Sequence, residues 1–320
     1  MKINIVNPDL NELGYVIAIA NIKDKHDTSA PSDYHWKILK CRMIIFSNSS
    51  ILACPDKNNV KQVHIIFNKA GDDYDKLISL FVKFSLIQNG GIRSATPEIY
   101  QKCFHYTMTA RIAPVWNTLQ DNYLINNRDF LVTRGPQEAV KYCIVVNDTF
   151  TVIEVNAVKI NLMLTEEEFL PGEWIRVLPS LNKAIVEDSY KDFPQGSKFK
   201  SYKNLRRHWK NIHGYRLPEN ESAYYSIQFW RGEPLLYPKE CVLRNFPVVI
   251  PTSQPLEKLI ISRFVTCLIS KMANVLGTKL IFKLEDIQPE DSKSHAPKDC
   301  LLETQAVSLC TPTQYSRSQK

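Results

Sequence analysis

The first ninety residues alternate between two kinds of segment, and this order restricts the fold more than any other feature of the chain. Residues 15–22 are rich in β-branched side chains and predict a buried strand. In residues 34–47 apolar side chains recur at helical spacing, and Asp33 is suited to cap that helix. Residues 60–68 predict a second strand, and acidic residues after Gly71 open a second helix. We therefore expect the order strand, helix, strand, helix.

The rest of the chain mixes the two kinds of segment less regularly. Residues 104–112 alternate loosely and favour a strand, and residues 142–146 and 150–162 predict a hairpin. Three glutamates at 166–168 are expected to open a short helix. Residues 256–272 carry apolar side chains at i, i+4 spacing, which predicts a long helix. These patterns together predict an α+β protein with mixed or antiparallel sheets and packed helices.

We expect three parts along the chain. Residues 1–95 form an N-terminal α/β part, and residues 96–287 form a C-terminal α+β part that contains a basic helix. Residues 288–320 are polar and dotted with proline, which is typical of a short disordered tail. With 320 residues and 44% apolar content, the folded part is large enough to bury a core without disulfides or metals.

The cysteines and the amino-terminal residues indicate an intracellular protein. The eight cysteines form no C-x-x-C pair, and Cys41, Cys143 and Cys267 lie in apolar sequence, where a reduced thiol acts as a small core side chain. Asp9 and Glu12 stand where a signal peptide needs apolar residues, and no stretch reaches the roughly 18 apolar residues of a membrane span. We expect a nuclear or cytoplasmic location rather than secretion, and no membrane partner.

The motifs of common enzymes are missing from this sequence. It contains no G-x-G-x-x-G, Walker, G-x-S-x-G or H-E-x-x-H motif. The acids at 72–75 lack the spacing of a calcium loop, and Cys103 and His105 have no second pair to complete a zinc site. We therefore assign no catalytic residue, no metal and no cofactor. Arg128 and Asp129 are expected to make a local ion pair or turn contact, with a ligand contact as the alternative.

Positive charge is concentrated in one segment. The chain has 40 Lys and Arg against 33 Asp and Glu, for a net charge of +7. Residues 195–217 contain seven of these cations and no acid, so the rest of the chain is neutral overall. A local concentration of charge is informative about partners in a way that an evenly spread charge is not. The candidate contact residues are Lys198, Lys200, Lys203, Arg206, Arg207, Lys210 and Arg216.

A basic amphipathic helix over residues 202–213 is the expected structure of this segment. Ser201 is suited to the N-cap position and Gly214 to the position that ends the helix. Four apolar side chains would share the inward face: Tyr202, Leu205, Trp209 and Ile212. Four cations would lie roughly opposite, at i, i+3, i+4 and i+7: Lys203, Arg206, Arg207 and Lys210.

Several interpretations of this stripe stay open. A row of charged side chains on a helix is usually just its solvated side. Like charges at this spacing repel one another, however, and an anionic partner would relieve that repulsion. The partner would be nucleic acid or an acidic protein. An anionic membrane fits less well, because the core needs the small apolar face. Aromatic residues nearby at 224–230 suit base stacking, although core or sheet-face packing is the favoured interpretation.

Six segments carry a resemblance to a known family. They are NPDLNEL at 7–13, TARIAPVWN at 109–117, NNRDFL at 126–131, WIRVLPSLNKA at 174–184, SYKNLRRHWKNIHGYRLPE at 201–219 and YPKECVLR at 237–244. In these segments the chain resembles an uncharacterised animal family typified by a human open reading frame on chromosome 18. The resemblance implies one folded unit to about residue 285, a domain of unknown function, and a nuclear protein rather than an enzyme. It supplies no catalytic or binding residue.

Our hypothesis from sequence is a non-enzymatic intracellular interaction module. Its basic helix would contact an acidic protein or nucleic acid. The alternative is an enzyme whose site is assembled from distant residues that no motif reveals. The oligomeric state and the identity of the partner stay open.

Overall fold

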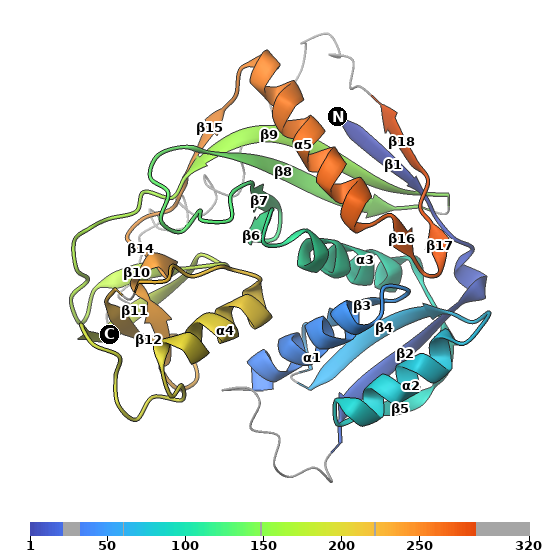
Figure 1. The fold of residues 1–320 in the computed structure, drawn as a ribbon, viewed down its shortest axis with the longest axis horizontal. Helices are drawn as coiled ribbons and strands as arrows, with labels where there is room; N and C mark the ends of the chain where they lie inside the picture. Colours follow the sequence, from blue (N-terminus) through green and yellow to red (C-terminus); the bar gives the residue numbers. More distant parts are fainter. Residues whose placement is uncertain (22–32, 60, 148, 221, 286–320) are drawn as a thin grey trace, which may run out of the picture. The chain divides into compact units, whose positions relative to one another are not determined.

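The computed structural model describes residues 1–21, 33–59, 61–147, 149–220 and 222–285, and residues 1–285 form one compact unit (Figure 1). Helices pack on sheets in which every pair of strands is antiparallel, so the predicted α+β class is confirmed. The predicted disordered tail at 288–320 lies outside the described residues.

The N-terminal sheet has the strand order β3-β4-β2-β5. Its strands are β2 (Leu13–Ala20), β3 (Leu52–Pro55), β4 (Gln62–Asn68) and β5 (Leu86–Ser94). A short 3-10 helix, η1 (Leu10–Glu12), precedes it, and two α-helices accompany it: α1 (Asp33–Ser47) and α2 (Asp73–Lys83). The two predicted strands and two predicted helices are confirmed as β2, α1, β4 and α2, but the predicted order omitted β1, β3 and β5. β-Branched residues of β2 and β4 pack with both helices in one core cluster.

A second sheet has the order β18-β1-β9-β8-β7-β6, with β15 also pairing with β9. Its strands are β1 (Lys2–Val6), β6 (Asn117–Leu119), β7 (Tyr123–Ile125), β8 (Gln137–Val146), β9 (Phe150–Asn161), β15 (Val248–Pro251) and β18 (Phe282–Glu285). The hairpin of β8 and β9 confirms the prediction for residues 142–162. Because β1 pairs with β9, the first strand joins a sheet built mostly by residues beyond 95. The division at residue 95 stays a prediction.

Two helices pack against this second sheet. α3 (Pro97–Ile112) lies between it and the N-terminal sheet, and α5 (Gln254–Lys271) lies across β8 and β9 (Figure 1). The expected strand over 104–112 is therefore wrong, because these residues form the second half of α3. The helix is buried from several sides, so its apolar residues do not form the single stripe that shows helical periodicity. A two-stranded ribbon of β16 (Asn274–Val275) and β17 (Thr278–Lys279) follows α5.

The third sheet supports the basic helix. Its order is β13-β12-β11-β10-β14. The strands are β10 (Trp174–Val177), β11 (Asn182–Tyr190), β12 (Tyr224–Gln228), β13 (Leu235–Pro238) and β14 (Val242–Leu243), with the 3-10 helix η2 (Lys239–Cys241) before the last. α4 (Tyr202–His213) shares one core cluster with this sheet. The predicted core packing of Tyr224 and Tyr225 is confirmed, whereas Trp230 is 92% exposed.

Two further local predictions are wrong. Residues 166–168 form no helix but lie in an irregular segment that Pro171 closes, since a proline disfavours helical backbone at the residue before it. In this segment Arg134 contacts Glu166 and Arg244 contacts Glu167. Cys143 is exposed rather than buried, because alternate side chains of β8 point away from the core.

Candidate functional site

α4 has the bounds expected from its sequence, and its two ends differ in how they are made. Ser201 precedes the helix in an extended conformation, but its side chain makes no capping hydrogen bond. Gly214 ends the helix with φ +77°, and its N–H donates to the carbonyl of Lys210 at 3.0 Å. This left-handed backbone favours glycine, because any other L-residue brings its Cβ close to the following carbonyl.

Gly214 is also required by crowding. A Cβ at this position would lie 2.8 Å from the Cβ of Ala113 and 3.2 Å from a guanidinium nitrogen of Arg42. Gly196 has a similar φ of +82°, but a Cβ there would meet nothing within 4 Å. The two glycines therefore share the same backbone requirement and differ in the space around them.

We expect Gly214→Ala to lower the free energy of unfolding by about 2–4 kcal/mol, because left-handed strain and overpacking add. Gly196→Ala is the matched control and should cost only the strain, about 1–2 kcal/mol. Urea denaturation of both variants measures the difference. Equal losses of unfolding free energy would show that the close contacts of the new Cβ with Ala113 and Arg42 do not destabilise the fold.

The inward face of α4 is apolar, as its pattern predicts. Tyr202, Leu205, Trp209 and Ile212 are buried. The Trp209 ring stacks near Tyr215, with centroids 6.0 Å apart, and meets the edge of Tyr237 at 5.3 Å. This packing fixes the rotation of the helix about its axis, and the rotation decides where its cations point.

The seven predicted contact residues divide by their partners. Three make ion pairs: Lys198 with Glu233 at 2.7 Å, Arg206 with Glu219 at 3.6 Å, and Arg216 with Asp129 at 3.9 Å. These pairs are exposed and solvent-screened, so each is weak. For the other four, Lys200, Lys203, Arg207 and Lys210, the described part of the chain offers no ion pair. Asp129 thus makes its ion pair with Arg216 rather than with its neighbour Arg128. The predicted turn contact is confirmed, because the Asp129 N–H donates to Asn127 Oδ1 at 2.9 Å and its carbonyl accepts from the N–H groups of Val132 and Thr133.

A groove of about 1000 Å³ runs beside α4 and collects cations from five separate segments. They are Arg42 of α1, Lys83 of α2, Arg128 of the segment after β7, Arg206 and Lys210 of α4, and Arg216. No Asp or Glu of the described residues lines it. The structure therefore divides the predicted stripe: Arg206 and Lys210 line the groove, whereas Lys203 and Arg207 do not.

Helix ends explain part of this clustering. The carboxyl ends of α1, α2, α3 and α4 all reach the groove, at Ser47, Phe84, Ala113 and Gly214. Each end carries about half a negative charge, so four ends offset about two of the six cations. The rim carboxylates Asp129 and Glu219 offset at most two more. A net positive charge remains, and the groove can accept an anion.

Three of the six groove cations are not among the seven contact residues predicted from the sequence, namely Arg42, Lys83 and Arg128. They lie far apart in the chain, so no spacing rule connects them. The one signal in the sequence is Arg42, a cation inside the apolar run of α1, where a buried arginine needs a reason.

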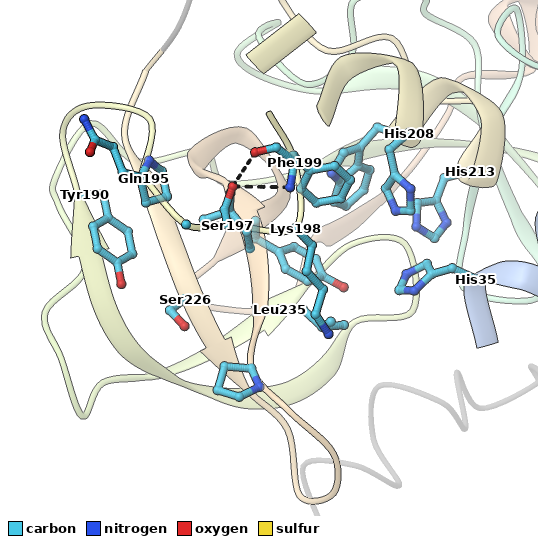
Figure 2. A pocket seen from close by; sticks show the side chains of 16 residues that line it. His35, Tyr190, Gln195, Ser197, Lys198, Phe199, His208, His213, Ser226 and Leu235 are labelled. Carbon is cyan, nitrogen blue, oxygen red and sulfur yellow. Dashed lines mark hydrogen bonds between the residues drawn. The ribbon is translucent and has the colours of Figure 1, made fainter. Parts of the chain in front are cut away.

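A second, smaller cavity of about 290 Å³ is lined by other residues of α4 (Figure 2). His35 of α1 and two histidines of α4, His208 and His213, turn toward one another beside Lys198. The His35 and His208 rings are 4.9 Å apart between centroids. Burial, with nearby Lys198, lowers the pKa of His35 to about 4, and burial, with nearby His35, lowers the pKa of His208 to about 3. The histidines are neutral at pH 7 and join α1 to α4.

These histidines do not make a metal centre. Within the described residues, no group of three or more His, Cys, Asp or Glu side chains is arranged to hold a metal ion. The cavity is instead lined by rings and small polar groups around neutral imidazoles.

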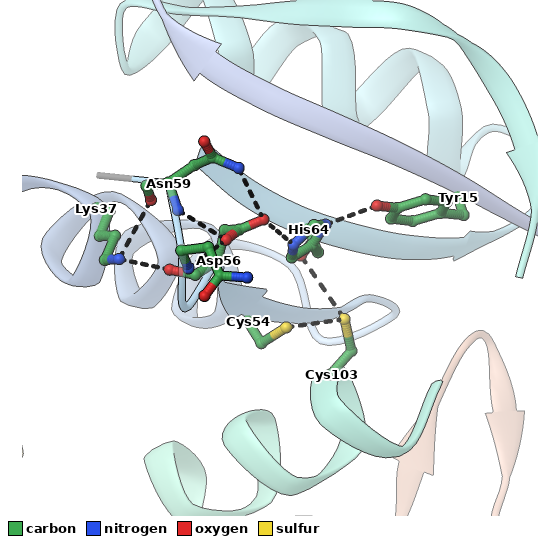
Figure 3. A network of polar contacts seen from close by, with 8 residues as sticks. Tyr15, Lys37, Cys54, Asp56, Asn59, His64 and Cys103 are labelled. Atoms are coloured by element: carbon green, nitrogen blue, oxygen red, sulfur yellow. Dashed lines mark hydrogen bonds and ion pairs between the residues drawn. The ribbon is translucent and has the colours of Figure 1, made fainter. Parts of the chain in front are cut away.

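A polar network at the start of the N-terminal sheet has the connectivity of a catalytic triad (Figure 3). His64 donates from Nε2 to Asp56 at 2.8 Å and accepts at Nδ1 from the Tyr15 hydroxyl at 2.6 Å. The hydroxyl of Tyr15 is not activated as a nucleophile, because burial raises its pKa to about 12 and the residue is 8% exposed. An activated nucleophile needs the opposite shift. The network ties β2, β4 and the loop after β3 together.

Comparison with known proteins identifies the family. The model of the domain of unknown function DUF4708 matches residues 3–170 and 161–251, so the chain belongs to this family. The family description names no activity. Within the described residues, no helix is both long and apolar enough to cross a membrane.

Solved structures of Argonaute proteins resemble the chain weakly. Marinitoga piezophila Argonaute in complex with 5′ OH guide RNA aligns at 11% identity over 84% of this chain and 35% of that chain, with a TM-score of 0.37. A. aeolicus Argonaute aligns at 7% identity over 88% of this chain and 43% of that chain, with a TM-score of 0.34. The chain spans less than half the length of either protein. Likenesses at these TM-scores assign neither fold nor function.

Proposed function

We propose that this chain is a non-enzymatic interaction module that binds single-stranded nucleic acid in the groove beside α4. The observation that carries the proposal is the set of six cations around one cavity that no carboxylate of the described residues lines. Phosphates are regularly spaced anions, and a groove of separately anchored cations suits them.

A single strand fits the groove better than a duplex. Phe46 lies in the lining and is 59% exposed, so a base can stack on its ring. Bases are available for stacking only when they are unpaired. Leu39 and Met43 extend the apolar floor beside Phe46. Cations for phosphates and an exposed ring for bases are the two elements that single-strand binding combines.

The proposal predicts that two pairs of cations on the same helix differ in importance. Arg206→Ala/Lys210→Ala removes groove cations, whereas Lys203→Ala/Arg207→Ala removes the same charge from the face outside the groove. We expect the first variant to bind short DNA and RNA oligonucleotides more weakly. We also expect its salt dependence, measured as the slope of log K against log salt, to be shallower by about 1.4, since each lost phosphate contact contributes about 0.7.

Fluorescence anisotropy at several salt concentrations measures this difference. Circular dichroism of both variants checks that α4 remains folded. Equal weakening of the two variants would mean that overall charge, not the groove, attracts the ligand. Unchanged binding in both, or no binding by the wild type, would remove nucleic acid as the partner.

An acidic protein is the second candidate. Lys200, Lys203 and Arg207 are exposed, lie outside the groove lining and make no ion pair within the described residues. An acidic partner that docks on this outer face would depend on Lys203 and Arg207 instead. Binding of a poly-glutamate peptide that is lost only in Lys203→Ala/Arg207→Ala would favour it. Membership of the animal family named above and a nuclear or cytoplasmic location remain predictions.

A further inference from the structure

Arg42 is the most unusual cation of the groove. It lies in α1, is only 8% exposed, and lines the groove together with residues of α2 and α4. Its Nε atom is buried and has no hydrogen-bond partner. Buried arginines are almost always paired, because a buried guanidinium without an acceptor loses its hydration and gains nothing in return.

The same helix shows how the fold satisfies a buried cation when it needs no ligand. Lys37 is 5% exposed, and its ammonium donates to the backbone carbonyls of Asp56 and Asn59, the latter at 3.2 Å. Both acceptors come from the loop before β4. Arg42, one and a half turns further along α1, receives no such acceptor at Nε from the protein. Of these two buried cations of α1, Arg42 is the one that lines the groove, and its Nε is the donor without an acceptor.

The surroundings of Arg42 hold its guanidinium in the lining of the groove. The guanidinium carbon lies 5.3 Å from the centroid of the Phe46 ring, within the range of a cation–π contact. On another side stands Gly214, and any Cβ there would come within 3.2 Å of a guanidinium nitrogen. The glycine therefore lets the end of α4 pack closely against Ala113 and the Arg42 guanidinium, which restricts the movement of that guanidinium.

The charge around this position specifies the chemistry of the acceptor. Arg128, Lys210 and Arg216 line the same groove, and none of the described acids does. A neutral acceptor would satisfy Nε but would leave the cations facing one another. A phosphate group satisfies the planar donor pair of a guanidinium and brings at least one negative charge.

We propose that Arg42, beside Gly214, is an anchoring subsite for one phosphate group of the ligand. This inference rests on the proposed function for the nature of that ligand. It adds that Arg42 is the residue that binds one of the ligand's phosphate groups. The phosphate is either an internal phosphodiester of the strand or a terminal phosphomonoester. The guanidinium donates from Nε and a terminal nitrogen, and the neighbouring cations supply attraction without being individually required.

The first test uses inorganic phosphate and the wild-type protein, so it needs no nucleic acid. Phosphate should shift the ¹H–¹⁵N signal of Arg42 Nε and the amide signal of Gly214, while chloride at equal ionic strength should not. It should also raise Tm by about 4 °C when present at about a hundred times its Kd. Absence of both shifts would overturn the subsite, whatever the oligonucleotide results.

The second test uses Arg42→Met, which keeps much of the buried volume and removes the charge. Without phosphate its Tm should equal or exceed that of the wild type, because a buried charge without an acceptor is lost. Phosphate should no longer raise its Tm, and oligonucleotide affinity should fall by about tenfold or more. Arg42→Lys, which keeps the charge but not the planar donor pair, should lose affinity as well.

Oligonucleotides with and without a terminal phosphate identify the source of the anion. A preference for the phosphorylated end that disappears in Arg42→Met assigns a phosphomonoester, and an equal loss for both assigns an internal phosphodiester. Phosphate binding at Arg42 without any oligonucleotide binding would contradict the proposed function and support the subsite. Oligonucleotide binding that Arg42→Met and Arg42→Lys leave unchanged would support the function and overturn the subsite.

Discussion

The free energy of unfolding should fall steeply as the pH is lowered from 6.5 toward 4, because the histidines between α1 and α4 are neutral in the fold. Burial lowers the pKa of His35 to about 4 and that of His208 to about 3, and it lowers the pKa of His213 well below its usual value. In this pH range these histidines bind protons in the unfolded chain but stay neutral in the folded chain. The stability is therefore complete above pH 6.5 and is lost as the pH falls.

The expected size of this effect is large. His35, which is 6% exposed, contributes a loss on the order of 3 kcal/mol by the time the pH reaches its folded pKa. Lys198 faces the cluster and adds to the cost of charging His35, and the three imidazoles repel one another once charged. Stability should fall further below about pH 4, where Asp56 becomes protonated in the unfolded chain before it does so in the fold. Burial raises the pKa of Asp56, but the backbone hydrogen bonds from Asn59 and Asn58 and the His64 contact outweigh it and hold the pKa at about 2.

Urea denaturation at a series of pH values measures this dependence. His35→Gln/His208→Gln is the control, because glutamine does not titrate and the slope between pH 6.5 and about 4 should become shallower. A wild-type stability that is flat over this range, or a slope that the double variant retains, would contradict the assignment of the cluster as the acid-sensitive element.

Replacing Trp209 with alanine should have the largest effect of any single change in α4. Trp209 is 2% exposed and packs against Tyr215 and Tyr237, so Trp209→Ala should cost about 3–5 kcal/mol. That loss is a large fraction of the total stability of an ordinary domain. Because Trp209 also sets the rotation of α4, oligonucleotide binding should weaken although no cation has been removed.

The matched control for this change is another tryptophan. Trp230 is 92% exposed, and Trp230→Ala should change the free energy of unfolding by no more than about 0.5 kcal/mol. Chemical denaturation of both variants gives the comparison. The interpretation of α4 fails if the two replacements cost the same, or if Trp209→Ala loses stability without any change in oligonucleotide affinity.

Local patterns predicted much of the fold because each depends on neighbours in the chain. The β-branched run of β2, the spacing in α1 and the hairpin of β8 and β9 are all visible within short windows. α3 is the instructive failure. Its residues touch two sheets, so apolar side chains surround the helix, and a window that looks for one apolar stripe finds a loose alternation instead.

The candidate site shows the same limit more sharply. The sequence by itself determined that α4 exists, where it begins and ends, and that Trp209 faces inward, because helical periodicity and glycine chemistry are local. It also located the excess charge in residues 195–217. Only the tertiary structure decided that Arg206 and Lys210 join Arg42, Lys83 and Arg128 in one groove while Lys203 and Arg207 stay outside. The physical reason is that electrostatic fields add through space, and only packing brings distant segments within reach of one another.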